Sequence, residues 1–124
     1  MRNRSVLLLL AGLFVGCSDE APVAAPGSLN VTVASPNGAE GAAIVLLLGD
    51  GVQSVSAVPP TELYAGGGSS QTRVVLFHPT GGDLMFEVAV TDTTNLPAWV
   101  VEEVAGPDDE LRSDVTAYSL EFGR

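Results

Sequence analysis

Few side chains in this sequence could carry out catalysis. His78 is the only histidine, and a serine hydrolase would need it beside a nucleophile held on a strained turn. Ser69 and Ser70 instead follow three glycines, and the sequence contains no G-x-S-x-G elbow. His78 ends an apolar run and precedes a proline, which is typical of a surface residue at the end of a strand. We therefore expect no enzymatic activity and no cofactor.

The densest group of acidic residues is a candidate calcium site. It comprises Asp108, Asp109, Glu110 and Asp114. Calcium binds about six to eight hard oxygen ligands, which one loop often supplies. The segment lacks the D-x-D-x-D-G spacing of a calcium-binding loop, and acidic residues at the first turn of a short helix would explain the same pattern. We therefore expect no bound metal. If calcium does bind, these four residues are the candidate ligands.

Two aromatic residues, Trp99 and Tyr64, could contact a ligand or a partner. Together they could form a platform on which a sugar or an aromatic ligand stacks. The chain has only seven aromatic residues, however, and a small domain needs several of them in its core. Both interpretations stay open for these two side chains, with core packing as the more ordinary one.

The only cysteine, Cys17, ends a segment typical of a secretory leader. Arg2 and Arg4 precede an apolar run over residues 6–15. This run is too short to span about 30 Å of hydrocarbon, which takes about 20 residues, but it fits the apolar region of a signal peptide. We predict that residues 1–16 are a signal peptide and that residues 17–27 carry a lipid and form a flexible tether.

The segment Phe14-Val15-Gly16-Cys17 resembles the lipobox of bacterial lipoproteins, in which apolar and small residues precede the cysteine. Phe14 departs from the usual leucine. The resemblance implies cleavage before Cys17, a thioether-linked lipid on its sulfur, and an acyl chain such as palmitate on the new amino terminus. It implies a protein anchored in the bacterial cell envelope, and Ser18 resembles the class sorted to the outer membrane in diderm hosts. An ordinary secretory signal with an incidental cysteine is the alternative.

The charge balance excludes several kinds of partner. The chain has 15 acidic residues, five arginines and no lysine, for a net charge of −10. Loss of Arg2 and Arg4 with the signal peptide would lower this to −12. Such a domain repels phosphate backbones, which argues against nucleic acid binding. It also cannot hold an anionic membrane by charge, so a membrane contact must come from the lipid.

The remaining residues, 28–124, form short apolar segments separated by turn residues, and we predict one domain. Leu29, Val31 and Val33 alternate with polar residues, as in a half-buried strand. Residues 98–105 could form a strand or a short helix, and residues 110–114 a single helical turn. Turns are predicted at residues 35–38, 49–51, 66–70, 79–82 and 106–110. The expected strands are residues 28–34, 42–48, 52–58, 62–65, 72–78, 84–90, 98–105 and 118–122.

The run from Ala42 to Leu48 differs from the others because it is apolar throughout. Such a run is typical of a central strand that is covered on both faces. If the domain itself leaves the second face uncovered, that face is a surface for a partner.

Seven or eight short strands without a long helix predict an all-β fold. We expect an antiparallel two-sheet β-sandwich of immunoglobulin or jelly-roll type, with a closed barrel as the alternative. The segments 27–33, 35–37, 41–43, 111–114 and 118–120 resemble a group of small uncharacterised bacterial lipoproteins. The Asn37-Gly38 turn with its following Gly-Ala strand is loosely similar to cohesin-type sandwiches. The resemblance implies a fold and a location, and it brings no activity.

From the sequence we expect a lipid-anchored cell-envelope protein that acts as a non-enzymatic protein-interaction or structural module. Its partners would be the membrane, through the lipid, and an envelope protein. A small carbohydrate-binding module that uses Trp99 or Tyr64 is the alternative. A hydrolase or a metal-dependent enzyme would require a pocket that brings His78 together with acidic residues or a serine.

Overall fold

The structure is a computed structural model, and it describes residues 23–124. Cys17, the predicted signal peptide and most of the predicted tether lie outside the described residues. The described part has eight strands and no helix, and therefore contains no helix long and apolar enough to cross a membrane. The strands are β1 (Gly27–Ala34), β2 (Glu40–Leu48), β3 (Val52–Ala57), β4 (Glu62–Gly67), β5 (Gln71–Gly82), β6 (Met85–Val90), β7 (Ala98–Ala105) and β8 (Ser119–Gly123).

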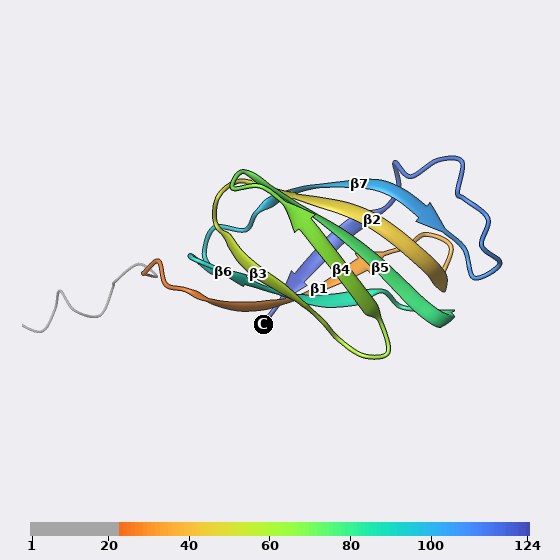
Figure 1. Ribbon diagram of the computed structural model, residues 1–124, viewed down its shortest axis with the longest axis horizontal. Coiled ribbons are helices and arrows are strands. Elements are labelled where there is room, and N and C mark those ends of the chain that lie inside the picture. Colours follow the sequence, from red (N-terminus) through yellow and green to blue (C-terminus); the bar gives the residue numbers. More distant parts are fainter. Residues whose placement is uncertain (1–22) are drawn as a thin grey trace, which may run out of the picture.

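The strands form two four-stranded antiparallel sheets in a β-sandwich (Figure 1). One sheet has the order β3-β6-β1-β8 and the other has the order β4-β5-β2-β7. The prediction of a two-sheet sandwich is therefore confirmed, and β7 is a strand rather than a short helix. In the described part no strand pairs across the two sheets, so the barrel alternative is wrong.

The strand pairs are nested around the turn between β4 and β5. This turn joins the innermost pair, and β3 with β6, β2 with β7 and β1 with β8 follow outward. The chain thus resembles a long hairpin folded over, which is how jelly rolls distribute eight strands between two sheets. In an immunoglobulin constant domain the first two strands share a sheet, whereas here β1 and β2 lie in different sheets.

The core lies between the inner faces of the two sheets. Alternate residues of each strand point inward, because successive side chains of a strand point to opposite faces. The side chain of Phe86 is fully buried, and Tyr118 closes the core beside β8. The other core residues are Leu29, Val31, Val33, Ala43, Val45, Leu47, Val74, Leu76, Leu84, Val88, Val90, Val101, Val104 and Leu120.

One predicted turn is part of a strand. We expected the chain to turn at residues 79–82, but β5 continues to Gly82. The register of β5 against β2 is irregular between its pairs with Ala42 and Glu40. Pro79 lies in this irregular stretch, where the missing N–H of a proline removes no ladder hydrogen bond.

Two further predictions around β4 and β7 need correction. We placed a glycine loop at residues 66–70, but β4 continues to Gly67, which pairs with β5. The helical turn expected at residues 110–114 is not formed. Leu111 instead makes a bridge with Ala105 of β7, so the chain runs back along the sheet.

The prediction that both faces of Ala42–Leu48 are covered is wrong. β2 is a central strand, and Ala43, Val45 and Leu47 on its inner face are buried. The alternate side chains on its outer face are only half-buried, between those of the neighbouring strands. The domain, as far as the structure describes it, therefore leaves an apolar strand face open.

Candidate interaction surface

The outer side of the β4-β5-β2-β7 sheet carries apolar side chains on all four strands. In antiparallel pairs, directly opposite residues share a face, so the register assigns the outward side chains. Tyr64 is 61% exposed, and Phe77 and Val100 are each 43% exposed. We call this surface the outer apolar face. It comprises Tyr64 of β4, Val75 and Phe77 of β5, Ala42, Ile44, Leu46 and Leu48 of β2, and Val100 and Ala105 of β7.

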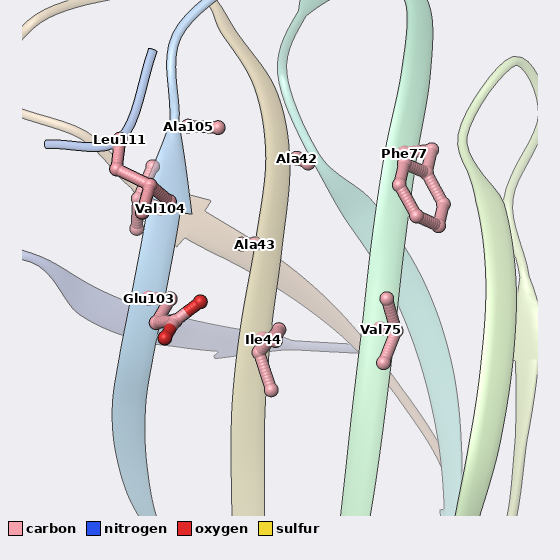
Figure 2. A pocket seen from close by; sticks show the side chains of 9 residues that line it. All are labelled: Ala42, Ala43, Ile44, Val75, Phe77, Glu103, Val104, Ala105 and Leu111. Atoms are coloured by element: carbon pink, nitrogen blue, oxygen red, sulfur yellow. The ribbon is translucent and has the colours of Figure 1, made fainter. Parts of the chain in front are cut away.

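A shallow groove of about 120 Å³ lies at one end of this face (Figure 2). One row of neighbouring residues crosses it: Phe77 lies opposite Ala42, Ala42 opposite Ala105, and Ala105 opposite Leu111. Two methyl side chains thus lie between two large apolar ones. Because the side chain of alanine is shorter than those of phenylalanine and leucine, the row leaves a depression with Phe77 on one side and Leu111 on the other. The next row also lines the groove and consists of Val75, Ile44 and Glu103.

A buried ion pair fixes the loop that carries Leu111. The Glu40 side chain is 2% exposed, and its Oε1 accepts hydrogen bonds from Nη2 and Nε of Arg112 at 2.9 and 3.1 Å. Its Oε2 accepts hydrogen bonds from the hydroxyls of Ser35, at 2.5 Å, and Tyr118. The backbone N–H of Arg112 also donates to the carbonyl of Val104 at 2.8 Å. These contacts of Arg112 hold the adjacent Leu111 beside β7.

The same contacts control the protonation of Glu40. Burial alone would raise the pKa of this carboxyl, because it disfavours the charged form. The hydrogen bonds from Ser35, Tyr118 and Arg112, together with the charge of Arg112, outweigh burial, so the pKa of Glu40 lies below its ordinary value of 4.5. Glu40 is thus a carboxylate at neutral pH and keeps its ion pair with Arg112 there.

Charged groups on the outer apolar face are few, and two of them neutralise each other. Arg73 donates to Glu102 at 3.1 and 3.3 Å. Glu103, which lines the groove, is exposed, and it has no ion pair within residues 23–124. Of the arginines in this range, Arg73 and Arg112 are already paired with other carboxylates. Glu62, which lies opposite Phe77 on β4, is also exposed and has no ion pair within residues 23–124, so the apolar groove has an uncompensated negative charge on each side.

The structure separates the two aromatic residues that were predicted as contacts. Tyr64 lies on the outer apolar face, where its ring meets Phe77 edge to face, with centroids 6.0 Å apart and planes at 74°. Trp99 lies opposite Leu47, an inward residue, and it is partly buried against the core. Tyr64 therefore has Phe77 as its aromatic neighbour, and no platform joins it to Trp99.

Two of the four candidate calcium ligands, Asp108 and Asp114, accept hydrogen bonds within their own turns. An Asp108 oxygen accepts a hydrogen bond from the backbone N–H of Glu110 at 3.2 Å. An Asp114 oxygen accepts one from the backbone N–H of Thr116 at 2.9 Å and one from its hydroxyl at 2.8 Å, which lower the pKa of Asp114. Asp109 takes a positive φ of 69°, as a turn residue. Residues 23–124 contain no group of three or more side chains of His, Cys, Asp or Glu that could hold a metal ion.

His78 has a similarly local role. It is half-buried near the end of β5, and its Nδ1 accepts a hydrogen bond from the backbone N–H of Thr80 at 3.3 Å. Within the part of the chain that the structure describes, His78 has no hydrogen bond to a serine hydroxyl or a carboxylate. His78 therefore has no partner there with which it could form a serine–histidine–carboxylate arrangement.

Sequence reasoning found part of this surface and missed the groove. The unbroken apolar run from Ala42 to Leu48 was a usable signal for the open strand face. Phe77 and Leu111 gave no such signal, because their places depend on pairings between distant segments.

Comparison of this chain with protein-family models, with curated proteins and with solved structures found no match.

Proposed function

We propose that the protein is a lipid-anchored module of the bacterial cell envelope that binds another protein through its outer apolar face and has no enzymatic activity. One observation carries this proposal: the outward positions of four neighbouring strands hold contiguous apolar side chains, among them Tyr64, Phe77 and Val100. The largest apolar patch on a soluble monomer is typically about 300–600 Å² and is often an interaction site.

The direction of the strands supports an anchored role. The described chain enters at the end of the sandwich where Gly27 pairs with Val90 (Figure 1). β1 runs away from this end and β2 runs back toward it, so Ala42, near the start of β2, lies toward the opposite end. A tether attached at Cys17 would thus leave the groove on the side facing away from the membrane.

The carbohydrate-binding alternative has less support. Flat sugar rings stack on exposed aromatic rings that lie parallel to the sugar, so a platform needs aromatic rings in one plane. Tyr64 and Phe77 lie at 74° to each other, and Trp99 packs against the core. These rings suit contact with apolar side chains better than stacking on a sugar.

Photo-crosslinking from two positions tests the binding surface. A photoreactive phenylalanine analogue replaces Phe77 on the outer apolar face or Ser54 on the outer side of the other sheet, in protein kept in its own membranes. We expect reproducible crosslinks to a protein from position 77 and none from position 54, with loss of the position-77 crosslink when Leu46→Glu is added. Equal crosslinking from both positions, or none from position 77, contradicts the proposal.

The anchor is tested separately by Cys17→Ser. We expect the variant to leave the membrane fraction and to lack the mass of the attached acyl chains. An unchanged membrane partition and an unmodified thiol in the parent protein would refute the lipoprotein part of the proposal.

A further inference from the structure

We infer that the segment held in the groove belongs to a cationic partner protein and presents an apolar side chain next to a lysine or arginine. This inference rests on the proposed function and specifies the partner of the same face.

The shape of the groove selects an apolar side chain. Its floor is made by the methyl groups of Ala42 and Ala105, and its sides by Phe77 and Leu111 (Figure 2). Leu111 is 67% exposed, so one side of the groove has much of its apolar surface in water. An apolar side chain that enters the groove removes this surface from water together with its own.

The charge beside the groove selects a cation. Figure 2 shows the Glu103 side chain on β7 beside Ile44, one row along the strands from the row of Ala42 and Ala105. No arginine of residues 23–124 forms an ion pair with this carboxylate. A lysine or arginine next to the apolar side chain of the partner would find an acceptor there without displacing an existing ion pair.

A second copy of this chain fits the face poorly. Each copy has a net charge of −10 and no lysine, so two copies repel each other and neither readily neutralises Glu103 of the other. The area of the outer apolar face also argues against a second copy. Four strands about 4.8 Å apart and roughly 24 Å long give a face of about 450 Å². Two stacked faces would bury about 900 Å², below the roughly 1,200 Å² at which stable interfaces begin. A cationic partner meets no such repulsion, and one that extends past the edges of the face can bury more than this area.

Charge-reversed variants of the full chain, held in phosphatidylcholine nanodiscs, test this inference. The probe is a fluorescent dodecapeptide of alternating leucine and lysine, with leucine–glutamate and serine–lysine peptides for comparison. Asp50→Lys is the matched control for Glu103→Lys, because both raise the net charge by two and Asp50 lies in the exposed turn after β2, at the opposite end of the sheet. Anisotropy is measured against empty nanodiscs, and each variant is checked for unchanged thermal unfolding.

We expect the leucine–lysine peptide to bind the parent chain and Asp50→Lys alike, and to bind Glu103→Lys at least about tenfold more weakly. The leucine–glutamate peptide should prefer Glu103→Lys over the parent chain, and the serine–lysine peptide should not bind measurably. Equal binding of the leucine–lysine peptide to all three proteins overturns the cationic partner, while crosslinks from position 77 would still uphold the proposed function. A dimer of the parent chain at micromolar concentration in sedimentation overturns it in favour of a second copy.

Discussion

The two sheets share one core, yet their outer faces differ. On the β3-β6-β1-β8 sheet the outward side chains are mostly polar, and they include Asn30 opposite Glu87 and Thr32 opposite Glu121. On the β4-β5-β2-β7 sheet Ile44 lies opposite Val75 at the corresponding position. An antiparallel sheet needs only one apolar face to fold. The inner faces therefore explain the fold, and the apolar residues on one outer face require another explanation, which the proposed contact with a partner would supply.

Substitution of two phenylalanine residues, one in the core and one on the outer apolar face, tests this difference. We expect the largest change in stability from this pair. Phe86 is fully buried on the inner side of β6, and Phe77 is 43% exposed on the outer side of β5. We expect Phe86→Ala to lower the free energy of unfolding by about 3–5 kcal/mol because it opens a cavity in the core. Phe77→Ala removes a side chain already partly in water and should cost about 1 kcal/mol.

Chemical denaturation of the two variants gives both values. Comparable losses of stability would mean that Phe77 is covered in the folded protein, and the outer apolar face would then belong to the core rather than to an interface.

The next largest effect concerns the network that joins the two sides of the sandwich. Glu40 begins β2, Arg112 lies beside Leu111, and Tyr118 precedes β8 of the other sheet. We expect Glu40→Ala to destabilise the protein by roughly 3 kcal/mol, at the low end of the cost of breaking a buried ion pair, because Arg112 can regain water. Amide hydrogen exchange should also rise around Leu111. A stability loss without faster exchange there would show that the network does not position the side of the groove.

The network also makes stability depend on pH. The hydrogen bonds on Glu40 outweigh its burial and hold its pKa below 4.5 in the folded protein. Its contribution is therefore complete above about pH 4.5 and is lost as the pH falls through the lowered pKa. Asp92 and Asp114, whose pKa values Thr94 and Thr116 lower, add to the same trend. We expect the unfolding free energy of Glu40→Gln to fall less steeply with acid than that of the parent chain, in denaturation curves between pH 2.5 and 7. Parallel pH profiles would contradict this assignment.

The strands were predictable because their inner faces carry a local signal. Leu29, Val31 and Val33 alternate strictly, and the structure buries all three. β7 was ambiguous for a physical reason: a bulge shifts its register against β2 between Ile44 and Val45, so its inward residues, Val101 and Val104, are three apart. A spacing of three is also found in helices, which is why residues 98–105 fitted both structures.

The groove could not be predicted in this way. It exists because Ala105 pairs both with Ala42 and with Leu111, and Leu111 was expected in a helical turn. Next to that bridge, Arg112 contacts Glu40, which is far from it in the sequence. Sequence patterns report the period of one segment, whereas a groove depends on which segments become neighbours.

A smaller effect is expected when polar and apolar residues are exchanged between the two outer faces. Replacing Ile44 and Leu46 by threonine should reduce the fluorescence of an apolar dye bound to the native protein, because less contiguous apolar surface remains. Replacing Asn30 and Thr32 by valine on the other sheet should raise it. Dye titration at matched protein concentration tests both. Dye fluorescence that changes with neither set of substitutions would show that the two outer faces do not differ in apolar surface.

The smallest effect is expected for the ion pair on the outer apolar face. Arg73 and Glu102 make two hydrogen bonds, but their side chains are 54% and 30% exposed, so water and salt compete with the pair. A double-mutant cycle with Arg73→Ala and Glu102→Ala should give a coupling energy of at most about 1 kcal/mol, falling as salt is added. A larger coupling that resists salt would mean that the pair is shielded from water. Shielding of these two side chains would also cover the apolar residues around them, and the contrast between the two outer faces would then be lost.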